Sequence, residues 1–182
     1  MITPFQKIKH DHQGFTLVEL LIVAAVLLVL GSIAVVAVTR SQRAARDTQV
    51  VYDLNQLQTA LEYYYTEHGR YPAVADGDSW TNVDTPGLAA NLKAQLDRLP
   101  QPPRTDNGET YTYVVSADGS AYYLGAHLEN STHTAFSNDV DTTIGGRDWK
   151  AIASDNAVDT TDPQLNCDDA QKMYCVSSSG LE

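Results

Sequence analysis

A long uncharged, apolar run near the N-terminus constrains this chain more than any other feature of its sequence. Residues 20–38 are nineteen consecutive residues without a charged side chain, and Glu19 stands immediately before them. A helix over this run is roughly 30 Å long at 1.5 Å per residue, which matches the hydrocarbon core of a bilayer. The run therefore predicts a membrane-spanning helix over residues 15–39.

This run has three ordinary explanations. A cleaved secretory signal has a shorter apolar region, of about 7–15 residues, and a small-residue cleavage site after it, whereas no Ala-x-Ala occurs within residues 34–38. A plain anchor fits the length, but a carboxylate that reaches the bilayer centre costs roughly 2–3 kcal/mol. Glu19 can also complement the dipole at the start of the helix, and taken alone that explanation stays open.

The order of residues at the helix start resembles a known processing motif. From Gly14 to Glu19 the chain reads Gly-Phe-Thr-Leu-Val-Glu and continues into the aliphatic run. This order resembles the prepilin motif of type IV pilins and of the pseudopilins of type II secretion and DNA-uptake machines. The resemblance implies cleavage after Gly14 by a prepilin peptidase, methylation of the new N-terminus at Phe15, and pairing of Glu19 with the terminal amine of a neighbouring copy. Opposite charges that are each costly in an apolar core become tolerable once they are paired and hydrogen-bonded.

The same resemblance implies a function in assembly. It predicts a single-pass precursor that lies in the lipid of the inner membrane. An assembly platform in that membrane would then join many copies of the chain into an extracellular or periplasmic filament. A type IV pilus subunit serving adhesion, twitching motility or DNA uptake is the first hypothesis. A major pseudopilin of a type II secretion system is the second. A membrane-anchored extracytoplasmic binding module that never polymerises is a third, from another class of protein.

Helical periodicity continues beyond the apolar run. The apolar positions recur at spacings of three and four residues, at Val50, Leu54, Leu57, Leu61 and Tyr64. Neither proline nor glycine occurs in residues 32–68, after which Gly69 and Pro72 favour termination. The pattern predicts one helix from about Phe15 to about Glu67, with an apolar half at 15–39 and an amphipathic half at 40–68. The Gly-Arg-Tyr-Pro turn at 69–72 also resembles the pilin and pseudopilin family.

Residues 69–182 predict a small globular domain. Alternating segments at 110–116 and 121–128 flank Asp118-Gly119, which favours a β-hairpin. A weaker strand is expected at 149–153, and leucines at helical spacing predict a short helix from Pro86 to about Arg98. Residues 1–14 are the predicted leader peptide. The predicted fold class of the remaining chain is α+β, with a long N-terminal helix packed on a small antiparallel sheet.

Cys167 and Cys175 enclose seven residues near the C-terminus. If this segment lies outside the cytoplasm, a disulfide is the economical interpretation, and free thiols are the alternative. Zinc would need two more ligands, and no histidine follows residue 133. The pair also resembles the disulfide-closed C-terminal loop of many type IV pilins, a resemblance that favours the pilus hypothesis.

Charge and motif content narrow the remaining function classes. The net charge of −11 does not suit passive binding of phosphate backbones, so we predict no nucleic-acid partner. The sequence contains no Gly-x-Ser-x-Gly, no His-Glu-x-x-His and no phosphate-binding glycine loop. We therefore predict that the protein is not an enzyme, with no catalytic residue and no cofactor.

The C-terminal region is rich in aspartate. Eight aspartates lie between residues 138 and 170, and carboxylate oxygens suit calcium. An EF-hand loop that begins at Asp139 fails, because Ile144 and Lys150 occupy its sixth and twelfth places. Solvated surface loops are the preferred interpretation, so no metal site is predicted, and calcium stays an open alternative.

Overall fold

The computed structural model describes residues 14–74, 87–104, 110–141, 143–145, 149–153 and 164–178. The chain divides into two compact units, Met1–Ser41 and Gln42–Glu182. Most of the predicted leader and four of the eight C-terminal aspartates lie outside the described residues, as does Pro86, the predicted start of the short helix.

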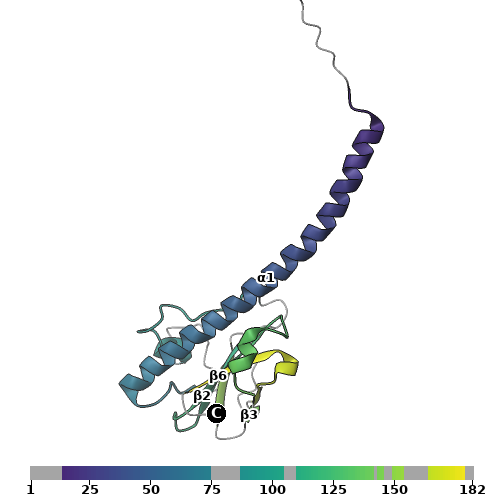
Figure 1. The fold of residues 1–182 in the computed structure, drawn as a ribbon. Coiled ribbons are helices and arrows are strands. Elements are labelled where there is room, and N and C mark those ends of the chain that lie inside the picture. Colours follow the sequence, from purple (N-terminus) through teal and green to yellow (C-terminus); the bar gives the residue numbers. More distant parts are fainter. Residues whose placement is uncertain are drawn as a thin grey trace, which may run out of the picture. The chain divides into compact units, whose positions relative to one another are not determined.

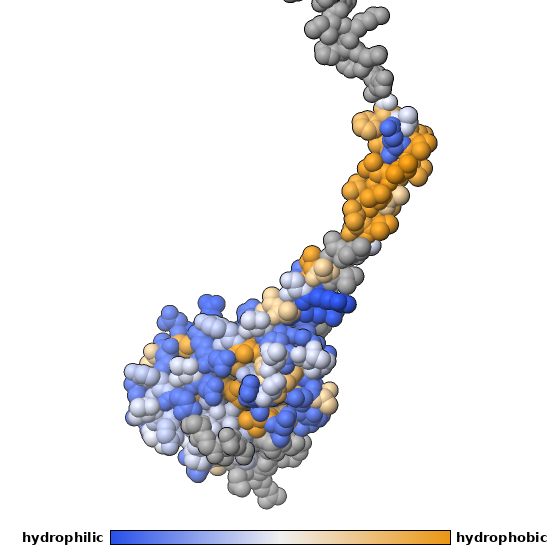
Figure 2. All heavy atoms as spheres, viewed as in Figure 1, coloured by the Kyte–Doolittle hydropathy of each residue, from blue (hydrophilic) through white to orange (hydrophobic). Residues whose placement is uncertain are grey.

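One uninterrupted helix, α1, extends from Leu17 to His68 (Figure 1). It ends where the sequence predicts, because Gly69 adopts a left-handed conformation with φ of 70° and donates its N–H to the Tyr65 carbonyl at 2.7 Å. Figure 2 shows that the hydrophobic residues of the N-terminal part of α1 form an apolar surface. The prediction of a single long helix is confirmed.

A four-stranded antiparallel sheet forms the centre of the second unit, in the order β4-β1-β2-β6. Its strands are β1 (Tyr111–Ser116), β2 (Tyr122–His127), β4 (Trp149–Ala153) and β6 (Met173–Ser177). A two-stranded sheet pairs β3 (Thr143–Gly145) with β5 (Gln164–Asn166). The hairpin and the strand at 149–153 agree with the prediction, whereas β3, β5 and β6 were not predicted.

The β1–β2 turn requires glycine at one position. Gly119 has a φ of 71°, and a Cβ there would lie 3.1 Å from the Cβ of Arg70 and 3.2 Å from the Tyr71 carbonyl oxygen. The Tyr71 N–H also donates to the Gly119 carbonyl at 2.8 Å. The hairpin turn is thus held directly against the end of the long helix by backbone contact.

The core of the second unit lies between the amphipathic part of α1 and one face of the sheet. Leu54, Leu57 and Leu61 of α1 are fully buried in the same cluster as tyrosines of β1 and β2. The buried phenols keep hydrogen-bond partners: the hydroxyl of Tyr111 donates to Asp53 at 2.7 Å, and that of Tyr122 to Glu62 at 3.3 Å. The leucine spacing therefore produces the packing face that the sequence predicted.

The helix predicted at residues 86–98 is shorter in the structure. The helix α2 comprises only Leu88–Asn91 and is followed by a turn. The Asn91 side chain donates to the Gly87 carbonyl at 2.7 Å, a local bond of the kind that competes with helix continuation. Leu88, Leu92 and Leu99 are buried nevertheless, so the leucine spacing reflects burial rather than a continuous helix. Two 3₁₀ segments, η1 (Thr134–Asn138) and η2 (Asp169–Gln171), complete the described elements.

Candidate functional site

Thr16 and Glu19 form a reciprocal cap at the start of α1. The Thr16 backbone N–H and hydroxyl both donate to Oε2 of Glu19, at 2.9 and 2.8 Å. In return, the Glu19 N–H donates to the Thr16 hydroxyl at 3.3 Å. This arrangement is a capping box, in which the side chains of the N-cap and the third helical residue satisfy otherwise unpaired backbone donors.

The cap gives Glu19 a local structural role that the prepilin resemblance alone did not assign. Both carboxylate contacts use Oε2, and Glu19 is exposed in the single chain. Within the described residues, Oε1 takes part in neither of these contacts and can accept a hydrogen bond from a further donor. The cap thus orients the carboxylate, and it leaves the pairing with another copy's amine to be tested.

The surface around Glu19 is apolar and uncovered. From Phe15 to Leu30, the large hydrophobic side chains are all more than half exposed. Such a surface is far larger than a soluble monomer leaves open, and it indicates a membrane or protein interface. Within the described residues, α1 is the one helix long and apolar enough to cross a membrane.

The predicted processing position lies immediately before this helix. Gly14 and Phe15 are exposed and precede the first helical residue, Leu17. A peptide bond outside regular secondary structure is the kind of position at which proteolysis occurs. The structure thus places Gly14 and Phe15 just before α1 and Glu19 in its first turn.

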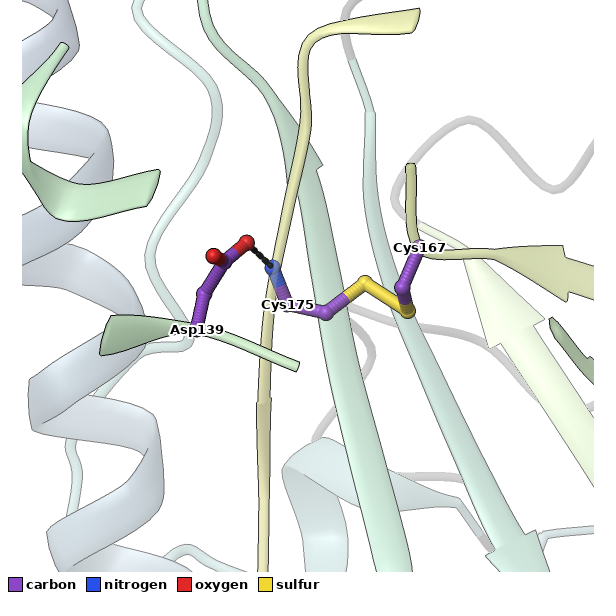
Figure 3. The surroundings of a disulfide bond; sticks show 3 residues. All are labelled: Asp139, Cys167 and Cys175. Atoms are coloured by element: carbon purple, nitrogen blue, oxygen red, sulfur yellow. Dashed lines mark hydrogen bonds between the residues drawn. A yellow bond between two sulfur atoms is a disulfide. The ribbon is translucent and has the colours of Figure 1, made fainter. Parts of the chain in front are cut away.

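Cys167 and Cys175 form a disulfide, with their Cα atoms 5.7 Å apart (Figure 3). Cys167 follows β5 and Cys175 lies within β6, and both are buried. The Cys175 N–H donates to Oδ2 of Asp139 at 3.3 Å, and the Val140 N–H donates to the Cys175 carbonyl at 3.1 Å. The disulfide thus fixes the edge strand β6, which in turn holds the segment at 139–140.

Asp139, Asp141 and Asp169 converge beside this disulfide. One carboxylate oxygen of each lies within 4.8 Å of the others. Among the described residues, Oδ1 of Asp139 and Oδ1 of Asp169 are buried without a hydrogen-bond partner. Burial, reinforced by the charges of Asp169 and Asp141, raises the pKa of Asp139 to about 6, although the Cys175 N–H opposes the shift. These three carboxylates have the donor chemistry of a hard-cation site, and part of the aspartate-rich region is less solvated than predicted.

Replacing Asp139 with asparagine is expected to raise the melting temperature at pH 7.5. A carboxyl whose pKa is raised in the folded state favours folding below its unfolded pKa, and this stabilisation is lost as the pH rises through about 6. Asparagine resembles the protonated acid, so the gain should disappear near pH 4. Thermal melts of the full chain in detergent and EDTA, from pH 4 to 8, measure the gain in melting temperature and its dependence on pH.

Asp118 provides a control of opposite sign for this experiment. Hydrogen bonds from Ser116 and Ser120 lower the pKa of Asp118 to about 2. Its contribution to stability is therefore present above its unfolded pKa and lost as the pH falls toward 2. Asp118→Asn should lower the melting temperature at pH 7.5, and equal shifts in both variants would contradict the assignment to Asp139.

A second polar cluster, which sequence reasoning missed, fixes α1 to the loop after β2. Asp47 is only 1% exposed, and its two carboxylate oxygens accept the N–H groups of Glu129 and Asn130 at 2.7 and 3.0 Å. The Arg46 guanidinium forms a two-pronged ion pair with Glu129, which lowers the pKa of Glu129. These contacts join residues that are 82 and 83 positions apart in the chain, and no local sequence pattern predicts such a pairing.

These observations define a class of protein: a small α+β domain built on the C-terminal part of a long helix whose N-terminal part is apolar, capped and exposed. Comparison with known proteins agrees. Residues 9–35 match the family described as the prokaryotic N-terminal methylation motif. No solved structure matched the chain.

Curated relatives match a much larger part of the chain. It is 32% identical over 116 residues to the type II secretion system core protein G of Escherichia coli (strain K12), covering 62% of this chain and 78% of that protein. It is 32% identical over 120 residues to the toxin coregulated pilin of Vibrio cholerae, covering 62% of this chain and 52% of that protein. The chain therefore belongs to the type IV pilin and pseudopilin family, and it is a structural subunit rather than an enzyme.

Proposed function

We propose that the chain is a subunit of a type IV pilus-like filament, processed after Gly14 and assembled through the apolar part of α1. The observation that carries this proposal is the exposed apolar surface from Phe15 to Leu30, in which Glu19 is the one charged residue. Lipid covers this surface in the precursor, and neighbouring copies cover it in the filament. In this proposal residues 1–14 are a leader, 15–39 the filament core, 40–68 the amphipathic helix and 69–182 the outer domain.

The chemistry of the helix start supports assembly. Cleavage after Gly14 creates an amine at Phe15, only four residues before Glu19. Oε2 of Glu19 already accepts hydrogen bonds from Thr16 of its own chain, so the amine of a neighbouring copy would donate to Oε1. An ion pair in an apolar environment is tolerated only when both charges are satisfied. The requirement therefore sets the register between copies.

A major pseudopilin of a type II secretion system is the second candidate. It is favoured by the similarity to core protein G, of which the chain covers 78%, against 52% of the toxin coregulated pilin. The disulfide between Cys167 and Cys175 resembles the closed loop of pilins and favours the pilus. A membrane-tethered binding module, which belongs to another class of protein, is the third candidate. In every case the peptidase and the assembly platform are proposed partners.

Mass spectrometry of the native protein, together with electron microscopy of the cell surface, tests the proposal. We expect the mature chain to begin with a methylated Phe15 and to be recovered in filaments. An intact Met1 on singly dispersed molecules would end the filament interpretation. Long surface fibres that disappear on deletion of the gene would support the pilus, whereas loss of protein secretion without long fibres would support the pseudopilin.

A further inference from the structure

An open groove of about 640 Å³ lies on the outer side of α1 within the second unit. Its wall on α1 includes Tyr52, Asn55, Thr59 and Tyr63, and the segment after α2 contributes Gln95. Tyr52 and Tyr63 are 66% and 61% exposed, and they are about 16 Å apart along the helix axis. We call this surface the tyrosine groove.

None of the described residues that line the tyrosine groove is charged. Among the residues that the structure describes, the lining consists of tyrosine, asparagine, glutamine, threonine, alanine and leucine. The exposed face of a helix in a soluble domain normally carries charges, and the whole chain has a net charge of −11. Depletion of charge and enrichment of tyrosine are the features that distinguish a protein interface from ordinary surface.

We propose that the tyrosine groove docks a second copy of this chain in the filament. The inference rests on the proposed function and adds a contact surface outside the apolar part of α1. Copies of a strongly acidic chain repel one another, and a contact through surfaces without net negative charge reduces that repulsion. The tyrosine groove provides such a surface on the same helix that assembles the filament core.

The chemistry of the lining suits a protein partner. Exposed tyrosines offer large amphipathic contact area with few rotatable bonds, and asparagine and glutamine adapt their hydrogen bonds to a partner's backbone. Among the described residues, Oε1 of Gln95 is a buried acceptor without a donor, while its Nε2 donates to Glu67 at 3.2 Å. This unsatisfied acceptor belongs to a residue that lines the groove.

The test introduces one negative charge inside the groove and one outside it. Thr59 lines the groove and Thr48 does not, yet both are exposed on α1 and donate their hydroxyl to the carbonyl four residues earlier. Thr59→Asp and Thr48→Asp therefore change the helix in nearly the same way. We expect Thr59→Asp to reduce sheared filament yield roughly tenfold, because burying an unpaired charge is unfavourable. Thr48→Asp should leave the yield within about twofold of wild type. Melting temperatures of both variants verify folding.

A photo-crosslinking amino acid placed at position 59 of the full chain identifies the occupant in cells. We expect a covalent dimer of this chain, absent when the same group is placed at position 48. Normal assembly of Thr59→Asp, or crosslinks only to another protein or to a glycan, would overturn the groove proposal. Glu19→Ala, measured in parallel, distinguishes failure of the groove proposal from failure of the proposed function. If it loses filaments while Thr59→Asp keeps them, only the groove proposal fails; if Glu19→Ala also assembles normally, the proposed function fails as well.

Discussion

Replacing Glu19 with glutamine is expected to abolish filament assembly while leaving the start of α1 helical. Glutamine functions in a capping box as glutamate does, so its side-chain oxygen can still accept from Thr16. The substitution removes the negative charge, and this loss would leave the amine of a neighbouring copy unpaired in an apolar environment. Removing one partner of a buried ion pair costs about 3–5 kcal/mol, which corresponds to a factor of roughly one hundred to several thousand in each contact.

The measurement is the amount of sheared filament relative to total protein, determined by immunoblotting in cells that express only the variant. Glu19→Ala should give the same loss, because it removes both the charge and the cap. Thr16→Ala is the matched control, because it removes the cap and keeps the charge. Loss of an N-cap side chain typically costs about 1 kcal/mol, so assembly should persist at reduced yield.

The three variants separate two roles of one carboxylate. If Glu19→Gln assembles normally while Glu19→Ala and Thr16→Ala fail, the capping box explains the residue and no inter-copy ion pair is needed. If Glu19→Gln and Glu19→Ala fail together and Thr16→Ala assembles, the charge is the essential property. The structure makes this comparison informative, because it places both Thr16 donors on the same oxygen of Glu19.

Features of this fold that depend on neighbouring residues were predictable from the sequence. The extent of α1 follows from periodicity and from the glycine after it, and the β1–β2 hairpin follows from alternation around Asp118-Gly119. The helix start was predicted from the order of residues at 14–19, but its capping geometry was not. The helix predicted at 92–98 is absent because leucines at helical spacing can also be buried from a turn and from extended chain, as Leu92 and Leu99 are.

Features that depend on distant pairing were not predictable. Strand β6 is short and joins the sheet only through its pairing with β2. The three converging aspartates come from segments about thirty residues apart, and their spacing along the chain fits no metal-binding loop. Asp47 resembles any other charged residue of an exposed helix until the fold places the backbone of residues 129–130 against it.

Asp47→Ala is therefore expected to destabilise the second unit more than any surface substitution. Asp47 is almost completely buried, and two backbone N–H groups depend on its oxygens. A hydrogen bond to a charged group contributes about 1.5–3 kcal/mol, and a buried donor left without a partner adds its own desolvation cost. The expected loss is about 3–5 kcal/mol, a large part of the total stability of a domain, and it lowers the melting temperature by roughly 10–20 °C.

Arg43→Ala is the control, because it removes a nearby charge that contributes little. Arg43 lies 3.6 Å from Glu129 with 58% of its side chain exposed, and such surface ion pairs contribute about 0–1 kcal/mol. Tryptophan fluorescence follows the melt, since Trp149 of β4 packs beside Tyr123 with ring centres 5.6 Å apart. A melting temperature of Asp47→Ala within about 2 °C of Arg43→Ala would contradict the prediction. A large loss with unchanged helical circular dichroism at low temperature would locate the damage at the contact between α1 and residues 129–130, because the helix itself would still be formed.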